Sequence, residues 1–262
     1  MEASLIIPFY KDISALELIL TALNSQSALG SFEAIITEDD NAPETTAFLE
    51  KFTPTVNFPI IHLTHEDLAF RKCKAINEAI KVATTDYLIF IDGDCIPHQH
   101  FIRQYIKEKE EKKILYGRRV NLSESFTKKI LQTKKLEMLN LFEMLISKST
   151  RVKEALYIPF MPGIFKSKRQ FWGCNWAILK KHLLEINGYD EDYTEYGFED
   201  LDIYKRLDMM GNQLKSVKYQ CIVYHLFHKT RAFNEVVNRT KEMYEKKMQE
   251  GKAKCLNGIE KL

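Results

Sequence analysis

Strand-like and helix-like patterns alternate four times within the first 117 residues of the chain. Apolar runs suited to buried strands occupy 4–9, 32–37, 58–63 and 86–92, and each precedes a segment with helical spacing of apolar residues. Four consecutive β–α units predict a mostly parallel sheet with helices on both faces. The predicted fold class is therefore α/β, and ligands are expected at the carboxyl ends of the strands.

The composition excludes several classes of protein. The chain has 262 residues and a net charge of +2, so its charge gives no reason to expect a nucleic-acid partner. Its five cysteines form no C-x-x-C pair, which argues against a disulfide framework or a cysteine zinc site and fits a reducing compartment. The N-terminus does not resemble a signal peptide, and no apolar run reaches the ~20 residues that span a bilayer. We expect a cytoplasmic protein, either soluble or peripheral on the inner face of the cytoplasmic membrane.

Two aspartates end the fourth predicted strand, in the sequence LIFIDGDCIP at 88–97. Asp92 and Asp94 would lie close together on a tight turn, where both carboxylates can reach one hard cation or the hydroxyls of a sugar. Such oxygen ligands suit Mg²⁺ or Mn²⁺. An ordinary Asp-Gly turn is the alternative interpretation. The three β–α units that precede the strand favour a functional site.

A second acidic cluster, GFEDLD, contains Glu199, Asp200 and Asp202. Acidic residues are common in the first turn of a helix, and their spacing alone favours that structural role. The aromatic residues Tyr196 and Phe198 stand beside them, however, and rings next to carboxylates are the usual lining of a sugar site. A carboxylate in such a pocket is a candidate general base.

Three further segments carry weaker signals. Residues 123–153 are rich in Lys and Arg and predict a long amphipathic helix, either packed on the domain or lying against anionic lipid. A helix is also expected over 177–185. Residues 214–228 predict strand structure that ends in His225 and His228, and although such histidines are usually structural, neutral imidazole is a common metal ligand.

With these residues identified, the sequence resembles a family 2 glycosyltransferase of the GT-A fold. It is most similar to bacterial members with a galactosyltransferase-like C-terminal region, the group that includes capsule and chondroitin-type polymerases. Six segments resemble the family's motifs in the family's order: LIIPFY, FEAIITEDDNA, FRKCKAINEAI, DYLIFIDGDCIP, the block from FWGCNWA to GFEDLDIYKRL, and VYHLFHK. The similarity covers nearly the whole chain. It implies a Rossmann-like, mostly parallel central sheet with a C-terminal acceptor-binding portion.

The resemblance also implies roles for individual residues. Asp94 and His225 would hold Mn²⁺ or Mg²⁺, with His228 in reserve. Asp200 would be the catalytic base, and Glu199 and Tyr196 would bind the acceptor, Glu199 as part of the catalytic pair. The residues expected around a UDP-sugar donor are Pro8, Phe9, Asp39, Arg71, Lys72, Asn77, Asp92, Gly93, Trp172, Gly173 and Asn175.

The sequence departs from the family pattern at a few positions. Ile76 stands where many relatives carry arginine, and Glu195 and Tyr196 replace the first two residues of a G-W-G motif. These changes leave the acceptor open. Residues 1–117 would form the nucleotide-sugar-binding half and residues 118–262 the acceptor-binding and catalytic half of one continuous domain.

The resemblance implies an inverting glycosyltransferase that moves Gal, GalNAc or GlcNAc to a glycan or lipid-linked glycan in bacterial surface polysaccharide synthesis. A metal-dependent nucleotidyltransferase is one alternative, but such an enzyme would normally show a glycine-rich loop near the N-terminus, where this chain has IPFYKDIS. An inactive carbohydrate-binding relative is another alternative, and the intact acidic pairs argue against it.

Overall fold

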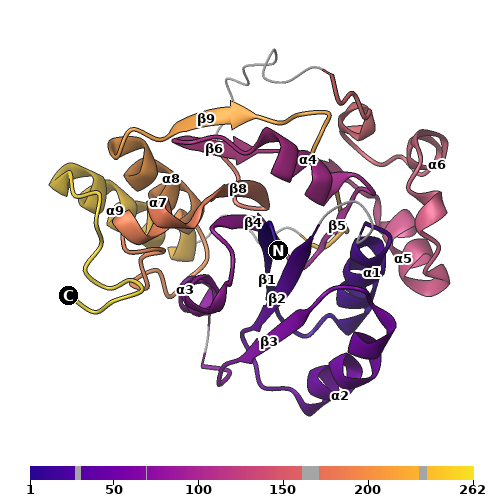
Figure 1. The fold of residues 1–262 in the computed structure, drawn as a ribbon, viewed down its shortest axis with the longest axis horizontal. Helices are drawn as coiled ribbons and strands as arrows, with labels where there is room; N and C mark the ends of the chain where they lie inside the picture. The colour runs from indigo at the N-terminus through magenta and orange to yellow at the C-terminus, as the bar shows by residue number, and fades with distance from the viewer. Residues whose placement is uncertain (27–30, 69, 161–170, 230–234) are drawn as a thin grey trace.

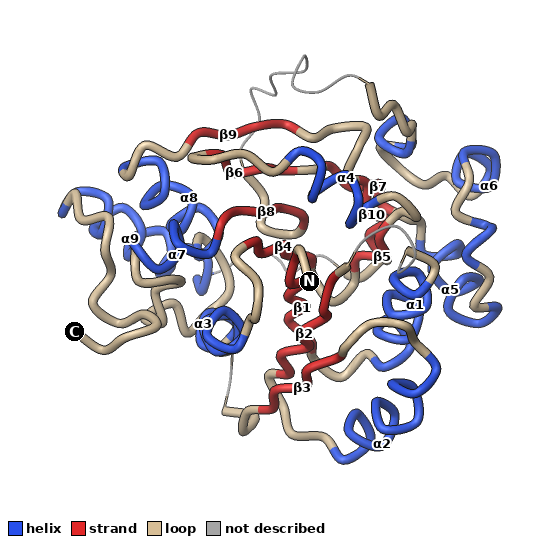
Figure 2. Tube along the Cα trace, in the orientation of Figure 1, coloured by secondary structure: helices blue, strands red, loops and turns tan. Residues whose placement is uncertain are grey.

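A seven-stranded sheet crosses the centre of the molecule (Figures 1 and 2). The computed structural model describes residues 1–26, 31–68, 70–160, 171–229 and 235–262. Among these residues the strand order is β3-β2-β1-β4-β8-β6-β9. The strands of this sheet are β1 (Ala3–Phe9), β2 (Phe32–Glu38), β3 (Ile60–Thr64), β4 (Tyr87–Ile91), β6 (Lys113–Tyr116), β8 (Asn175–Leu179) and β9 (Gln213–Ser216).

Parallel pairing dominates the N-terminal part of this sheet. β1 pairs in parallel with both β2 and β4, and β3 pairs in parallel with β2. β8 is the exception, because it runs antiparallel to both β4 and β6. The predicted α/β class and mostly parallel central sheet are therefore confirmed. The flanking helices are α1 (Ile13–Asn24), α2 (Pro43–Phe52), α3 (Lys72–Val82), α4 (Phe101–Glu108), α5 (Glu124–Thr133), α6 (Leu141–Ile146), α7 (Lys180–Glu185), α8 (Glu199–Met209) and α9 (Glu235–Glu250).

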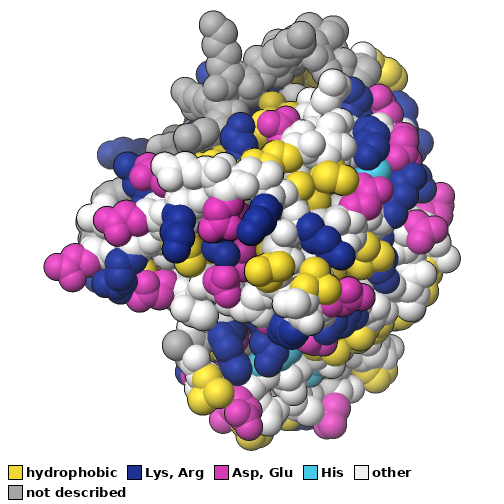
Figure 3. Space-filling view, turned by 90° about the vertical axis from the view of Figure 1, so that its left-hand side faces the viewer, with side chains coloured by type: hydrophobic (Ala, Val, Ile, Leu, Met, Phe, Trp, Pro, Cys, Tyr) yellow, Lys and Arg dark blue, Asp and Glu magenta, His cyan; other side chains and the backbone are white. Residues whose placement is uncertain are grey.

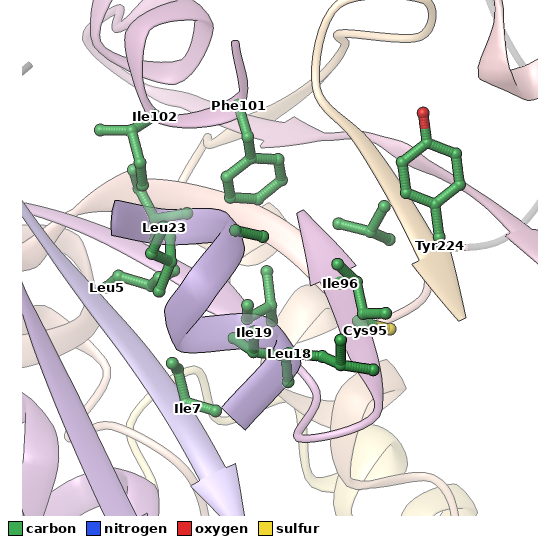
Figure 4. Close-up of a cluster of buried hydrophobic side chains, with 14 of the residues drawn as sticks. Leu5, Ile7, Leu18, Ile19, Leu23, Cys95, Ile96, Phe101, Ile102 and Tyr224 are labelled. Atoms are coloured by element: carbon green, nitrogen blue, oxygen red, sulfur yellow. The ribbon is translucent and has the colours of Figure 1, made fainter. Parts of the chain in front are cut away.

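Apolar clusters lie on both faces of the sheet, as a strand period of two requires. Leu5 and Ile7 of β1 belong to one cluster and Ile6 to the other. On the first face Ile19 of α1 packs with Leu5 and Ile7 (Figure 4). On the second face α3 contributes Ile80. Burial of these apolar side chains fixes helices to both sides of the sheet.

Local sequence explains where several helices begin. The Asp12 carboxylate accepts a hydrogen bond from the Ala15 backbone N–H and caps α1. Pro43 occupies the first position of α2, where its missing N–H costs nothing. Ser123 caps α5 by accepting from the Phe126 N–H.

A three-stranded sheet brings His225 and His228 to Asp92 and Asp94, which form the first acidic pair. It contains β5 (Cys95–Pro97), β7 (Arg118–Asn121) and β10 (Ile222–His225), with β10 in the middle. β10 pairs antiparallel with β5, so His225 lies opposite Cys95. The Leu226 backbone N–H donates to the Asp94 carbonyl over 2.9 Å. Residues about 130 positions apart thereby meet at the end of β4.

The prediction of one long helix over 123–153 is wrong. The structure has two short helices there, α5 and α6, with 3-10 turns at Leu136–Met138 and Val152–Ala155. Lys134 ends α5 in the left-handed conformation, with φ 56°, and Arg151 adopts φ 57°. Non-glycine residues in this conformation interrupt helical hydrogen bonding.

The 117/118 boundary does not divide the central sheet. β6 comes from the first half of the chain, and it pairs with β8 and β9 from the second half.

On the side of the molecule that carries α7, α8 and α9, acidic and basic side chains are intermixed across the surface (Figure 3).

Candidate active site

A cavity of about 1010 Å³ opens at the carboxyl ends of β1, β2 and β4, where the fold class predicts a ligand. Both halves of the chain line it, from the end of β1 to the end of β10. The candidate residues among those that line it are Pro8, Phe9, Asp39, Lys72, Asp92, Asp94, Tyr196, His225 and His228. The fold therefore brings together five of the eleven donor candidates and all three metal candidates.

The first acidic pair sits on a tight turn directly after β4. The Cys95 N–H donates to the Asp92 carbonyl over 3.0 Å and closes the turn. Gly93 lies against the end of β1, where an added Cβ would be 2.6 Å from the Pro8 carbonyl oxygen. Glycine is therefore required for the close approach of the two backbones, and the turn aims both Asp92 and Asp94 at the cavity.

Asp94 faces two histidines. Its Oδ2 atom lies 3.3 Å from Nε2 of His225 and 3.3 Å from Nε2 of His228. Burial, together with the nearby Arg119 guanidinium, lowers the pKa of His225 to about 3, so its imidazole is neutral at pH 7. Burial and the neighbouring Asp92 carboxylate raise the pKa of Asp94 to about 6.

These groups fit a divalent cation. A carboxylate oxygen suits both Mn²⁺ and Mg²⁺, and a neutral imidazole is a common ligand of transition metals. The Cys95 sulfur lies in the same cluster, whose ligand atoms are all within 4.8 Å of one another. Burial raises the pKa of the Cys95 thiol well above its ordinary value, which favours the protonated thiol in the absence of a cation.

The second acidic pair begins α8. Glu199 is buried, and its Oε2 accepts a hydrogen bond from the Gly197 N–H over 2.9 Å. Asp200 accepts from the backbone N–H of Gly173, and a Cβ at Gly173 would collide with its carboxylate. Burial raises the pKa of Asp200 to about 7, although the Lys72 ammonium acts to lower it. Gly173 thus supports the candidate base and lies outside the cavity lining.

Lys72 joins the two acidic pairs. Its Nζ atom is 3.4 Å from Oδ1 of Asp92, 3.7 Å from Oε1 of Glu199 and 3.8 Å from Oδ1 of Asp200. The two pairs therefore belong to one cluster at the edge of the cavity. Burial alone would lower the pKa of the Lys72 ammonium, but Asp200, Asp92 and Glu199 together raise it well above its ordinary value.

The end of the cavity next to β1 and β2 contains Asp39. Its Oδ2 atom accepts from the Arg71 backbone N–H over 2.8 Å, and its own N–H donates to the Phe9 carbonyl. Arg71 does not line the cavity, but its Nε atom also lies 4.0 Å from Oδ1 of Asp39, so both its backbone and its guanidinium contact this carboxylate.

Two asparagines expected near the donor make buried hydrogen bonds to other parts of the fold. The Asn77 side chain is buried and holds Tyr189 through both the N–H and the carbonyl of that residue. Asn175 accepts from the Tyr105 hydroxyl over 2.6 Å and donates to the Cys221 carbonyl. Neither asparagine lines the cavity.

The sequence prediction missed Arg119. It stands on β7 and lines the cavity, and its guanidinium carbon lies 4.8 Å from the centre of the Trp172 ring. Arg151 stacks on the same ring at 4.5 Å. Trp172 thus contacts two guanidinium groups, and of these three residues only Arg119 lines the cavity. The paired arginines of the YGRRVN segment, inside a strand, were the available signal.

Comparison with models of known protein families assigns the chain to one of them. The model of glycosyl transferase family 2 matches residues 4–171, which is more than half of the sequence. The chain belongs to this family. A second model, described as the N-terminal domain of galactosyltransferase, matches residues 162–229 and includes the second acidic pair and both histidines. The resemblance seen in the motifs is thereby confirmed.

The curated relatives are distant and longer. An uncharacterized glycosyltransferase, YfnE of Bacillus subtilis, is 25% identical over 80% of this chain and 61% of its own length. Chondroitin synthase of Escherichia coli is 22% identical over 85% of this chain and 34% of its own length. Validoxylamine A glucosyltransferase of Streptomyces hygroscopicus is 22% identical over 79% of this chain and 51% of its own length. The chain spans less than two thirds of each.

Solved structures confirm the GT-A fold. GalNAc-T7 with UDP, GalNAc and Mn²⁺ superposes with a TM-score of 0.62 at 12% identity, over 87% of this chain and 44% of that one. Staphylococcus aureus TarS with UDP has a TM-score of 0.59 at 15% identity, over 86% and 60%. The mannosyltransferase PcManGT of Pyrobaculum calidifontis, with GDP-Man and Mn²⁺, has a TM-score of 0.56 at 13% identity, over 93% and 60%. Within the described residues, no helix has the length and apolar character needed to cross a bilayer.

Proposed function

We propose that this protein is an inverting, metal-dependent glycosyltransferase that uses a UDP-sugar donor. It moves a hexose or N-acetylhexosamine, with Gal, GalNAc and GlcNAc as the candidates, to a hydroxyl of a glycan or lipid-linked glycan. The observation that carries the proposal is the contact of Lys72 with both acidic pairs, because it places a candidate base beside a candidate donor site. Similarity to chondroitin synthase supports a role in bacterial surface polysaccharide synthesis.

The cavity provides the donor site in this proposal. Pro8, Phe9 and Asp39 would surround the nucleoside, and Asp92 would meet the ribose or the sugar. Asp94 and His225 would hold Mn²⁺ or Mg²⁺. The UDP complexes of TarS and GalNAc-T7 support a uridine nucleotide, and the Mn²⁺ in the GalNAc-T7 and PcManGT structures supports a divalent metal. Residues 1–117 would thus supply most of the nucleotide contacts.

Asp200 is the candidate base for the acceptor hydroxyl. Its side chain is 27% exposed, so an acceptor hydroxyl can reach the carboxylate, and its buried Oδ1 atom has no hydrogen-bond partner among the described residues. Abstraction of that proton lets the acceptor oxygen attack the anomeric carbon from the face opposite the UDP leaving group, which inverts the configuration. When bound, the divalent cation neutralises negative charge on the diphosphate.

Glu199 and Tyr196 are the proposed acceptor contacts. Tyr196 is half exposed, lines the cavity and packs edge-on against Phe70 with ring centres 6.4 Å apart. The hydrogen bond from Gly197 to Glu199 fixes the loop that carries Tyr196. A ring at this position can cover the apolar face of a sugar.

Residues 123–153 support a peripheral membrane contact as part of the proposal. The helix α6 exposes Phe142, Leu145 and Ile146 by 69%, 65% and 64%. These apolar side chains belong to a segment rich in Lys and Arg, and that combination favours binding to an anionic lipid surface. Such binding suits a lipid-linked acceptor on the cytoplasmic face. We expect the protein to float with anionic liposomes and the triple variant F142S/L145S/I146S to stay in the dense fraction. Equal recovery of both would reject the contact.

A panel of donors tests the proposed function. UDP-Gal, UDP-GalNAc and UDP-GlcNAc are incubated with the protein, with and without Mn²⁺ or Mg²⁺, and UDP release is measured. We expect release from at least one donor, only with metal. Pyrophosphate release from UTP and a sugar phosphate would identify a nucleotidyltransferase instead. Sugar binding without any turnover would identify an inactive relative.

A further inference from the structure

The position of Lys72 gives it a role beyond nucleotide binding. It is the first residue of α3, and its side chain is only 17% exposed. Its ammonium faces three carboxylates that come from two other parts of the fold, the turn after β4 and the start of α8. A lysine that served the donor diphosphate alone would have no need to approach Glu199 and Asp200.

The Lys72 ammonium balances the negative charge of the carboxylates around Asp200. Among the residues that the structure describes, the charged groups that act on Asp200 are Lys72 from α3, Asp92 from the turn after β4 and Glu199 from α8 itself. Tyr189 and Cys73 also face this cluster, but burial raises the pKa of both well above the ordinary values, so both are neutral. Within the described part of the chain, Lys72 is therefore the positive group that offsets the carboxylates nearest the candidate base.

The contact leaves the base free to react. Lys72 lies 3.8 Å from Oδ1 of Asp200, beyond ordinary hydrogen-bond distance, and Oδ1 itself is buried. The Asp200 side chain is still 27% exposed, so the ammonium can stabilise the ionised carboxylate without covering the part that an acceptor hydroxyl can reach.

We propose that Lys72 is a positioning residue that favours the ionised form of Asp200 and holds it beside the donor aspartate Asp92. This inference rests on the proposed function, because it assigns Lys72 to the same transfer reaction. It separates Lys72 from the residues that bind the nucleotide. Its main effect is on the proton-transfer step, and its effect on donor affinity is small.

The test compares Lys72→Met and Lys72→Arg with the wild type. Lys81→Met is the matched control, because Lys81 lies on the same helix but is exposed and pairs with Glu78. In K72M we expect the acid limb of the kcat profile to move up by about 1–3 pH units, as loss of an opposite charge at this distance predicts. Turnover at pH 7 should fall roughly 10- to 100-fold and recover toward pH 9. K72R should retain most of the activity, and K81M should match the wild type.

Two readouts separate this role from its alternatives. Calorimetry with UDP and Mn²⁺ should give K72M an affinity within about threefold of the wild type. A tenfold loss of UDP affinity with an unmoved acid limb would overturn the proposal and make Lys72 a nucleotide-binding residue. An unchanged profile in K72M would also overturn it.

A further measurement does not depend on turnover. The carboxyl ¹³C signal of Asp200, assigned by its absence in Asp200→Asn, is titrated in wild type and in K72M. We expect a higher midpoint in K72M. Equal midpoints would contradict the role of Lys72 even if every donor tested proved inactive, whereas an inactive wild type with a shifted K72M midpoint would contradict only the proposed function.

Discussion

The two acidic pairs of the molecule contain the same kind of side chain but have different surroundings. Asp92 and Asp94 lie on a strand-to-strand turn that lines the cavity, and Asp94 faces two imidazoles. Glu199 and Asp200 begin a helix behind the cavity lining and face one ammonium. A carboxylate beside neutral imidazoles suits a cation, whereas a desolvated carboxylate beside an ammonium suits proton transfer. Partners, more than residue type, distinguish the two pairs.

The largest effect should come from removing the base of the second pair. Asp200→Asn keeps the shape of the side chain but cannot accept a proton, so turnover should fall about 10²- to 10⁴-fold. The KM for the donor should change little, because Asp200 does not line the donor cavity. Steady-state UDP release measures both constants. Near-normal turnover in this variant would show that the base lies elsewhere.

The two histidines beside the first pair should differ in importance. The His225 side chain is 11% exposed, whereas that of His228 is 53% exposed and can be replaced more easily by water. In His225→Ala the Mn²⁺ concentration for half-maximal activity should rise at least about tenfold, and in His228→Ala it should rise less. Metal titration of UDP release measures this. A larger rise in His228→Ala would reverse the assignment.

The pH dependence of the wild type should reflect the second pair. The pKa of Asp200 is raised to about 7, and only the ionised carboxylate can accept a proton. Turnover should therefore increase as the pH rises through 7 and fall about tenfold for each pH unit below it. The measurement is kcat from pH 5 to pH 9 at saturating donor and metal. A flat profile across pH 7 would conflict with a base in this environment.

A smaller effect should appear in stability. Because the folded state raises the pKa of Asp200 above its unfolded value, the contribution of this carboxyl to stability is greatest below pH 4 and is lost as the pH rises through about 7. Asp200 is about a quarter exposed, so the cost at pH 8 is about 1–3 kcal/mol. Asp200→Asn should thus melt a few degrees higher than the wild type at pH 8.

The control for this stability effect lies on the same helix. Asp208 is half exposed near the end of α8, and Asp208→Asn should leave the melting temperature nearly unchanged at both pH 4 and pH 8. If Asp200→Asn melts below the wild type at pH 8, the ionised carboxylate stabilises the fold, and the folded state does not raise the pKa of Asp200.

Much of the fold could be predicted because the N-terminal signals are local. Each of the first four β–α units has its own apolar run followed by a helical pattern, and no distant residue is needed to recognise it. The short segment at β8 was different. The expectation of a helix over 177–185 was partly wrong, because Asn175–Leu179 is a strand and only Lys180–Glu185 is helical. A short apolar run does not distinguish a strand from a helix, and here its pairing with β4 and β6 decides.

The same distinction applies to the site. Asp92 and Asp94 could be found because strand and turn are contiguous in sequence. The place of Lys72 could not, because it depends on how the first turn of α3 faces the first turn of α8, more than 120 residues later. The structural contacts of Asn77 and Asn175 also depend on distant partners, Tyr189 and Cys221. Resemblance located these asparagines, but only packing shows what they hold.

Calorimetric titration of UDP into Asp94→Asn and Asp200→Asn, each with and without Mn²⁺, tests the division between the two acidic pairs most directly. We predict that Asp94→Asn loses the metal-dependent part of UDP binding and that Asp200→Asn retains it. Metal-dependent UDP binding that survives in Asp94→Asn but is lost in Asp200→Asn would contradict the account.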